Sequence, residues 1–317
     1  MRIIFLGTPD FAVPSLQILV ENGYDIAAVI TAPDKAAGRG QKMQMSAVKQ
    51  YAVSKNLLVL QPEKLKDVTF IEQVKALHAD LQIVVAFRMM PEVLWSMPKY
   101  GTFNLHGSLL PQYRGAAPIQ RAVMNGERKT GVTTFFLKHE IDTGNIIFRE
   151  EILVGDQETS GELHDRMMHI GASLVLKTVK AIESKAIELK EQDSFILSGE
   201  ELHHAPKIFR DDCRLDFSKS SLELFNQVRG LSPYPGAFFE MQLPSGEINM
   251  VKVLKAEYES ESVFMSHHLT SDNKKLIKIS TKDGFLVLKE IQWPGKKRMT
   301  TEEFLRGHSL PQEFTLL

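Results

Sequence analysis

Short apolar runs alternate with amphipathic segments along the first half of the chain. The runs are Ile3–Leu6, Ile26–Thr31, Leu57–Leu60, Leu81–Ala86 and Thr102–His106. Between them, segments such as Pro14–Glu21 and Ser46–Lys55 have apolar residues at helical spacing. Runs that are apolar throughout are typical of parallel strands covered on both faces. The pattern predicts an α/β domain with a Rossmann-like, mostly parallel sheet.

Two further apolar runs predict a hairpin or bent ribbon that closes this sheet. Gly131–Leu137 and Ile146–Leu153 flank the sequence Asp-Thr-Gly-Asn at residues 142–145, which is rich in turn-forming residues.

A long amphipathic helix is predicted next, from Ser160 to about Ala186. Thr159 and Glu162 have the spacing of a capping box, and an apolar stripe follows them. The sequence then becomes polar and irregular, which indicates a linker. We therefore expect a catalytic domain over residues 1–186, a linker over 187–208 and a second domain over 209–317.

The last third of the chain predicts a small antiparallel barrel. Short helices are expected near Ser220 and Thr300, where Glu223 and Glu303 lie three residues on, as in a capping box. Gly, Asp and Asn turns separate four strand-like runs, which are Ala237–Gln242, Glu247–Leu254, Leu276–Ser280 and Phe285–Ile291.

The overall charge limits how the protein can bind a polyanion. Its 317 residues include 38 Lys and Arg against 39 Asp and Glu, so any nucleic-acid contact has to be a local patch. Lys35, Arg39 and Lys42 form one basic cluster, and residues 274–298 hold eight basic against two acidic residues. A solvated surface is the competing interpretation of both.

Several function classes are disfavoured by what the chain lacks. Its one cysteine, Cys213, excludes an intramolecular disulfide and a cysteine-rich zinc site, and it fits a reducing compartment such as the cytoplasm. No apolar stretch reaches the roughly 18 residues of a membrane helix. The turn after the first strand, Gly7–Phe11, lacks the later glycines of a dinucleotide fingerprint, so we expect no nicotinamide cofactor. We also expect no metal.

The strongest candidates for chemistry lie in the segment Thr102–Gly115. Strand periodicity puts Asn104 and His106 on one face, at the carboxyl end of a strand, where sheets of this kind bind ligands. An Asn amide can stabilise a developing oxyanion, and His can move protons near neutral pH. The alternative is a strand-end His that is hydrogen-bonded to its own loop.

Asp142, in the predicted turn, is a third candidate. If the hairpin folds back beside the Asn104 strand, Asp142 could orient His106 or carry protons, and a local Asx turn is the alternative. No activated nucleophile is evident, so the substrate is expected to supply it. A hydrolase in which the three residues activate water remains a second possibility.

At these positions the chain resembles the formyltransferases that use 10-formyltetrahydrofolate, along nearly its whole length. A long motif, NLHGSLLPxYRGAAPI, begins at Asn104, and a DTG motif begins at Asp142. GTPDFA at Gly7 and PDK at Pro33, followed by AGRG at Ala37, also match. The resemblance implies that the two motifs supply a catalytic trio, which would be Asn104, His106 and Asp142.

The resemblance also implies ligands for both predicted domains. An OB-like β-barrel is expected to bind tRNA, and the basic loop near Arg39 marks the branch of the family that acts on tRNA. The tRNA contacts are expected at Lys35, Arg39, Lys42, Lys296, Lys297 and Arg298. The folate contacts are expected at Phe87, Arg88, Met89, Ser108, Leu109, Leu110, Pro111, His139, Glu140 and Ile141.

The implied reaction moves a formyl group from 10-formyltetrahydrofolate to the α-amino group of methionyl-initiator tRNA, on a monomer that binds neither membrane nor DNA. A family member with a small amine acceptor, such as glycinamide ribonucleotide or a nucleotide-linked amino sugar, would share the trio but lack both basic patches. A hydrolase of formyl-folate would need no acceptor. A catalytically silent RNA-binding module would not need the trio.

Overall fold

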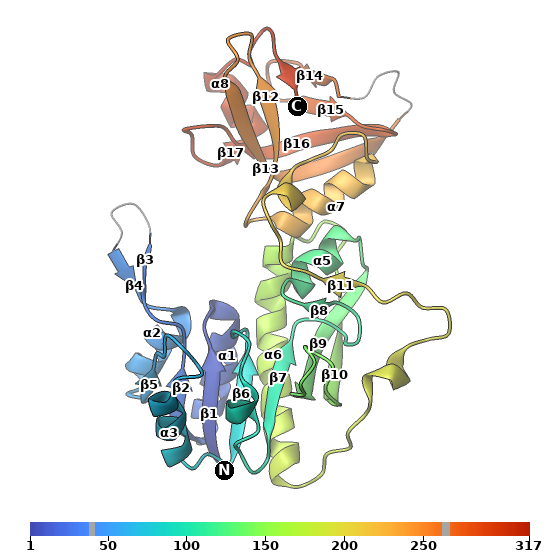
Figure 1. The fold of residues 1–317 in the computed structure, drawn as a ribbon. Coiled ribbons are helices and arrows are strands. Elements are labelled where there is room, and N and C mark those ends of the chain that lie inside the picture. Colours follow the sequence, from blue (N-terminus) through green and yellow to red (C-terminus); the bar gives the residue numbers. More distant parts are fainter. Residues whose placement is uncertain (38–41, 262–266) are drawn as a thin grey trace. The chain divides into compact units, whose positions relative to one another are not determined.

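A computed structural model describes residues 1–37, 42–261 and 267–317 (Figure 1), without the side chains of Ala37 and Lys42. The chain forms two compact units. The first consists of Met1–Pro118, Lys129–Leu153 and His164–His204, and the second of Ile119–Arg128, Val154–Leu163 and Ala205–Leu317. The domain bounds drawn from the sequence, 1–186, 187–208 and 209–317, stay a prediction beside this division.

The first unit is built on a seven-stranded sheet with the strand order β10-β9-β7-β6-β1-β2-β5 (Figure 1). The strands are β1 (Arg2–Gly7), β2 (Asp25–Ile30), β5 (Val59–Leu60), β6 (Leu81–Val85), β7 (Thr102–His106), β9 (Lys129–Phe136) and β10 (Ile146–Leu153). The pairs along β7-β6-β1-β2-β5 are parallel, whereas β9 is antiparallel to both β7 and β10. The predicted Rossmann-like, mostly parallel sheet is confirmed.

Helices pack on both faces of this sheet. They are η1 (Asp10–Ala12), α1 (Val13–Glu21), α2 (Ala47–Ser54), α3 (Val68–Ala76), α4 (Glu92–Trp95) and α6 (Ser160–Glu183), whereas most of α5 (Pro118–Met124) belongs to the second unit. On one face, Ile4 of β1 shares a buried cluster with Phe70 of α3 and Leu94 of α4. On the other, α6 packs against the sheet, where the hydroxyls of Thr134 and Thr178 are 2.8 Å apart.

The predicted long helix is confirmed, including its start. The Glu162 carboxylate accepts from the amide of Thr159 at 2.8 Å, and the Glu162 amide donates to the Thr159 hydroxyl at 3.3 Å. Both bonds satisfy groups at the helix terminus. One predicted strand is shorter than expected, because the amide of Leu57 donates to Ala52 at the end of α2 and β5 begins only at Val59.

Five short elements lie outside the main sheet of the first unit, four strands that form two pairs and one 3-10 helix. The strands β3 (Lys35–Ala37) and β4 (Lys42–Gln44) form an antiparallel pair. The strands β8 (Arg114–Gly115) and β11 (His204–Ala205) form a second small sheet, and the 3-10 helix η2 spans Gln192–Phe195.

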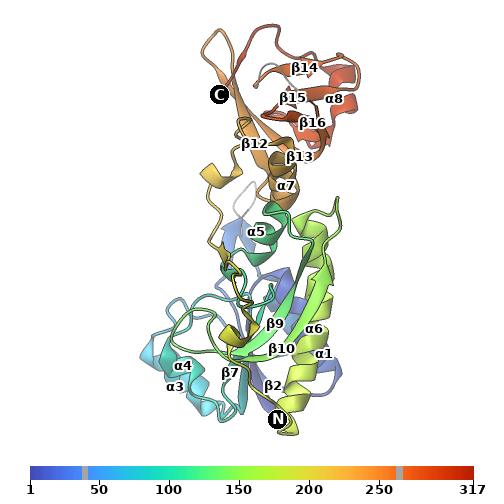
Figure 2. The same ribbon diagram turned by 90° about the vertical axis from the view of Figure 1, so that its right-hand side faces the viewer.

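The second unit is a half-barrel of antiparallel strands around its own core (Figure 2). Its main elements are η3 (Asp211–Cys213), α7 (Ser221–Leu231), β12 (Ala237–Gln242), β13 (Ile248–Ser260), β14 (Leu269–Ser271), β15 (Ile277–Ser280), β16 (Gly284–Gln292), β17 (Met299–Thr300), α8 (Thr301–Gly307) and β18 (Thr315–Leu316). Both predicted capping boxes are present, at Ser220 and Glu223 and at Thr300 and Glu303.

No helix in the described part of the chain is long and apolar enough to cross a membrane.

One glycine decides how closely β10 approaches β9. A Cβ on Gly131 would lie 2.1 Å from the Glu150 carbonyl oxygen and 2.5 Å from Leu109 Cδ2. Gly131→Ala should therefore lower the free energy of unfolding by about 1–3 kcal/mol, measured by urea denaturation. Gly307→Ala is the control, because a Cβ there meets no atom within 4 Å. A neutral effect of Gly131→Ala would contradict this account of the strand pairing.

Candidate active site

Asn104 and His106 lie on the same face of β7, as strand periodicity predicts. Leu105, between them, faces the opposite way, where a Cβ on Gly171 of α6 would lie 2.7 Å from its Cδ2. His106 is buried and meets the ring of Phe135 edge-on at 6.4 Å. The side-chain oxygen of Asn104 is buried and has no hydrogen-bond partner among the described residues. A buried polar atom without a partner is costly, so this amide is suited to a bound ligand.

The loop after β7 determines which ring nitrogen of His106 is available. His106 Nε2 lies 2.8 Å from the carbonyl oxygen of Tyr113. Because a carbonyl oxygen only accepts, Nε2 has to carry the proton, and Nδ1 of the neutral ring is left unprotonated. The alternative of a histidine bonded to its own loop is thus correct for Nε2, and Nδ1 remains available for chemistry.

Asp142 lies beside this nitrogen. Its Oδ2 lies 3.9 Å from His106 Nδ1 and accepts a hydrogen bond of 3.0 Å from the amide of Gly115. The bond to Gly115 joins two loops that are far apart in the sequence, which differs from a local Asx turn. The structure therefore brings His106 and Asp142 together, as expected if the hairpin folds back beside the Asn104 strand.

The backbone of the β9–β10 loop explains the sequence Asp-Thr-Gly. Asp142 has a φ of 55°, in the left-handed region that Asp tolerates better than most residues. Gly144 passes so close to β9 that a Cβ would lie 1.5 Å from the carbonyl oxygen of Phe136. Any larger residue at Gly144 would push the loop away from the strand, and Asp142 would move with it.

A residue that the sequence did not single out supports the same loop. Gln192, expected only as part of a polar linker, is 3% exposed and donates to the carbonyl oxygens of Asp142 at 2.7 Å and Gly144 at 2.9 Å. Nothing in the local sequence distinguishes it from a solvated linker glutamine. Only the fold reveals its contacts.

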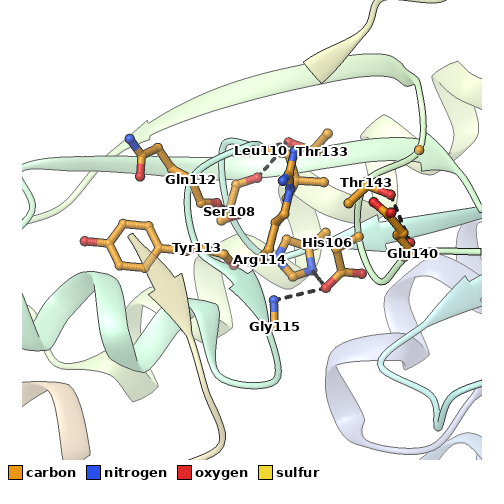
Figure 3. Close-up of polar contacts among 12 residues, drawn as sticks. His106, Ser108, Leu110, Gln112, Tyr113, Arg114, Gly115, Thr133, Glu140 and Thr143 are labelled. Carbon is orange, nitrogen blue, oxygen red and sulfur yellow. Dashed lines mark hydrogen bonds and ion pairs between the residues drawn. The ribbon is translucent and has the colours of Figure 1, made fainter. Parts of the chain in front are cut away.

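The predicted folate residues in the loop after β7 differ in how they could act. The side chains of Ser108, Leu110 and Pro111 are buried, whereas Leu109 is half-buried. Ser108 and Leu110 are bound to Thr133, which donates to the Ser108 carbonyl at 2.7 Å and accepts from the Leu110 amide at 3.1 Å (Figure 3). Of these four residues, Leu109 has the most accessible surface for a ligand.

The remaining predicted folate residues belong to two loops that pack against the same core. Phe87 and Leu137 both border the cluster around α3 and α4. The side chain of Met89 is 73% exposed and that of Ile141 59% exposed, so both are open to a ligand.

Polar contacts hold the other three residues of these loops. Arg88 donates to the carbonyl oxygens of Pro62 and Glu63, and partial burial lowers the pKa of its guanidinium. His139 pairs with Glu92 at 3.1 Å, and the carbonyl of Glu140 accepts from the Thr143 hydroxyl at 3.0 Å.

The predicted tRNA residues of the first unit lie around the β3–β4 pair. Lys35 is exposed on β3, whereas Arg39 and the side chain of Lys42 lie outside the described residues. Just before β3, Asp34 forms an ion pair of 2.6 Å with Lys49 and accepts from Gln61 at 2.8 Å. These hydrogen bonds lower the pKa of Asp34 and tie the start of β3 to the body of the unit.

The basic residues between 274 and 298 fall into two groups. Three of them form ion pairs inside the second unit, namely Lys278 with Glu259, Lys289 with Glu257 and Arg298 with Glu290. The others occupy the turns. Lys296 and Lys297 are exposed in the turn between β16 and β17 and have no ion pair with the described residues.

No group of three or more His, Cys, Asp or Glu side chains that could hold a metal is found among the residues described. Cys213 is buried, which raises the pKa of its thiol.

The fold and the site together define a class of enzyme. Residues 1–179 match the formyl transferase family, and residues 207–309 match the formyl transferase C-terminal domain. The matched regions include the Asn104, His106 and Asp142 cluster and most of the half-barrel. The chain therefore belongs to the formyl transferase family.

Several proteins that match this chain along nearly its whole length are methionyl-tRNA formyltransferases. The one from Bacteroides thetaiotaomicron is 50% identical over 321 aligned positions, which cover 100% of this chain and 98% of the relative. The one from Parabacteroides distasonis is 51% identical, with the same coverage. The one from Flavobacterium johnsoniae is 48% identical and covers 99% of this chain and 98% of the relative.

Solved structures share the fold at lower identity. An N-formyltransferase from Helicobacter canadensis, in complex with folinic acid and dTDP-3-aminofucose, has a TM-score of 0.64 at 23% identity and covers 94% of this chain and 100% of that chain. HypX from Aquifex aeolicus, in complex with tetrahydrofolic acid, has a TM-score of 0.64 at 18% identity, with 99% and 50% covered.

The Tyr113 carbonyl predicts the tautomer of His106. At a pH where the ring is neutral, Nε2 should carry the proton and Nδ1 should not, because Nε2 faces the carbonyl oxygen of Tyr113, which can only accept. Nitrogen-15 NMR of the imidazole distinguishes the two tautomers directly. The buried ring should keep this tautomer in Asp142→Asn. A ring protonated at Nδ1 alone would contradict the assignment.

Proposed function

We propose that this protein transfers the formyl group of 10-formyltetrahydrofolate to the α-amino group of methionyl-initiator tRNA. The observation that carries the proposal is the whole-length identity of about half to methionyl-tRNA formyltransferases of several bacteria. Solved members of the fold in complex with folinic and tetrahydrofolic acid support a folate as the formyl donor. The product is N-formylmethionyl-tRNA, the form that starts translation.

The proposed reaction needs no nucleophile from the protein. The α-amine attacks the formyl carbon, the carbonyl oxygen takes up negative charge, and the bond from carbon to N10 of the folate then breaks with its electron pair going to N10. One proton leaves the amine and one reaches N10, so charge and atoms balance. The side chains therefore have to supply orientation, stabilisation of an oxyanion and proton transfer.

Asn104, His106 and Asp142 are the residues we assign to these tasks. The Nδ2 group of Asn104 can donate a hydrogen bond to the developing oxyanion, and its buried Oδ1 has no partner among the described residues. Nδ1 of His106 is free to take up a proton, since Nε2 is held by Tyr113. Asp142, whose Oδ2 lies 3.9 Å from Nδ1, is placed to assist proton transfer at that nitrogen.

The ligand contacts are proposed in the same way. For the folate we propose contacts with Ser108, Leu109, Leu110 and Pro111 and with the two loops Phe87–Met89 and His139–Ile141. The exposed Met89 and Ile141 supply apolar surface there.

For the tRNA we propose Lys35, Arg39 and Lys42 in the first unit. In the second unit we propose Lys296, Lys297 and Arg298. These residues are suited to phosphate contacts, which provide affinity without reading bases.

We further propose that the protein is a cytoplasmic monomer. Charged initiator tRNA is used in that compartment, and all three proposed catalytic residues come from one chain. Sedimentation equilibrium tests the oligomeric state, and a mass of two or more chains would contradict a monomer.

A single assay tests the acceptor. Formyl-labelled 10-formyltetrahydrofolate is incubated with the protein and with methionyl-initiator tRNA, a charged elongator tRNA, glycinamide ribonucleotide, a nucleotide-linked amino sugar, or no acceptor. Label should reach the initiator tRNA. Label found only on a small amine, or released only as formate, would contradict the proposal.

Variants of the trio belong to the same prediction. Asn104→Ala and Asp142→Ala should each lower kcat by at least about 100-fold, because each removes a group that acts on the transition state. Binding of methionyl-tRNA should stay within about threefold of wild type. Loss of tRNA binding in either variant would indicate a structural role instead.

The free lysines of the β16–β17 turn generate a separate prediction. Lys296→Glu combined with Lys297→Glu should raise the KM for tRNA about tenfold at low salt, and the effect should shrink as salt increases. The same charge change at the exposed Lys66 and Lys180 of the first unit is the control. An equal effect of both double variants would assign the loss to overall charge and reject a local contact.

A further inference from the structure

The polar segment between α6 and β11 contacts the loop that contains Asp142 through Gln192. Gln192 begins the 3-10 helix η2, and its side-chain amide is buried. Its nitrogen donates to the carbonyl oxygens of Asp142 at 2.7 Å and Gly144 at 2.9 Å. Both hydrogens of the amide nitrogen are thus used on one loop, the loop that contains the proposed proton-transfer residue.

The oxygen of the Gln192 amide binds the loop after β7, which contains Arg114. Gln192 Oε1 accepts two hydrogen bonds from the guanidinium of Arg114, from Nε at 2.9 Å and from Nη2 at 2.7 Å. Arg114 directly precedes Gly115, whose amide donates to the Asp142 carboxylate at 3.0 Å. One side chain therefore joins residues 114–115 to residues 142–144, on both sides of His106.

Gln192 is itself held in place from both sides. Two residues before it, Lys190 exchanges backbone hydrogen bonds of 2.8 and 3.0 Å with Ile146 at the start of β10. Three residues after it, Phe195 packs against the buried cluster of Leu110, Phe135 and Ile146. A side chain between two such anchors loses little further entropy on making its four hydrogen bonds, so it can hold a loop that would otherwise move.

The geometry points to a role for this residue. We propose that Gln192 is a positioning residue, which holds the Asp142 loop against His106 through the carbonyls of Asp142 and Gly144. The inference rests on the proposed function, because it assigns Gln192 to the proton-transfer step through Asp142. It also explains why a segment expected to be only a linker follows the site before it reaches the second unit.

Two variants separate the two ends of the amide. Gln192→Glu keeps an oxygen for Arg114 but replaces the donor with an oxygen that faces two carbonyl oxygens, so it breaks only the contact with the Asp142 loop. Gln192→Leu removes both contacts at similar volume. The control is Asp193→Asn, the reverse exchange of carboxyl and amide at the next position, which is exposed.

The kinetic test is a double-mutant cycle with Asp142→Asn. Gln192→Glu should lower kcat by about 10- to 100-fold with little change in either KM, because a shift of about 1 Å in a reacting group has this effect. In the Asp142→Asn background the same exchange should lower kcat less than about threefold. A purely structural role would lower kcat equally in both backgrounds, and that result would overturn the proposal.

A second measurement does not depend on activity. Hydrogen exchange of the peptide that covers residues 138–145 should be at least about tenfold faster in Gln192→Glu and Gln192→Leu than in wild type, and unchanged in Asp193→Asn. Unchanged exchange in both Gln192 variants would overturn the proposal. If wild-type protein formylates no tRNA, the proposed function fails, and the exchange experiment still decides whether Gln192 holds the loop.

Discussion

The return of the β9–β10 loop to His106 is the constraint on which the rest of the site depends. Because β9 runs antiparallel to β7, Phe136 lies opposite Phe103. The β9–β10 loop therefore begins near the amino end of β7, whereas His106 lies at the carboxyl end. His106 is three residues further along β7, or about 10 Å at the rise of a strand. The chain has to fold back over the face of the sheet to bring Asp142 within 3.9 Å of the ring. The left-handed backbone at Asp142, the close approach at Gly144 and the amide of Gln192 all serve this return.

Some of this was predictable from the sequence, because the signals are local. The strand period put Asn104 and His106 on one face, and the capping residues fixed the starts of α6, α7 and α8, since both effects act over only a few residues. The distance between Asp142 and His106 could not be predicted from their spacing. The two residues are 36 positions apart, and the distance depends on where the chain between them folds back. The resemblance to the formyltransferases implied that Asp142 and His106 belong to one site, and the fold places them together.

The features that escaped prediction share a physical cause. Gln192 acts through hydrogen bonds to main-chain carbonyls, which any sequence provides, so no partner residue type indicates the contact. Tyr113 likewise contacts His106, and Gly115 contacts Asp142, through backbone atoms. Contacts of this kind leave no charge pattern or periodicity in the chain, and only the folded backbone identifies them.

The basic residues of the second unit are the opposite case. Their clustering is clear in the sequence, but it includes both lysines paired within strands and free lysines in turns. Eight basic residues between 274 and 298 suggest one continuous strip, but antiparallel strands put successive turns at alternate ends of the sheet. The turns before β15 and after β16 therefore share one end, whereas Lys282 lies at the other. Within the strands, Lys278 and Lys289 are neutralised by glutamates of β13. The strand cations thus stabilise the half-barrel, and the free charge gathers at the turns, where long side chains can follow a phosphate backbone without disturbing the sheet.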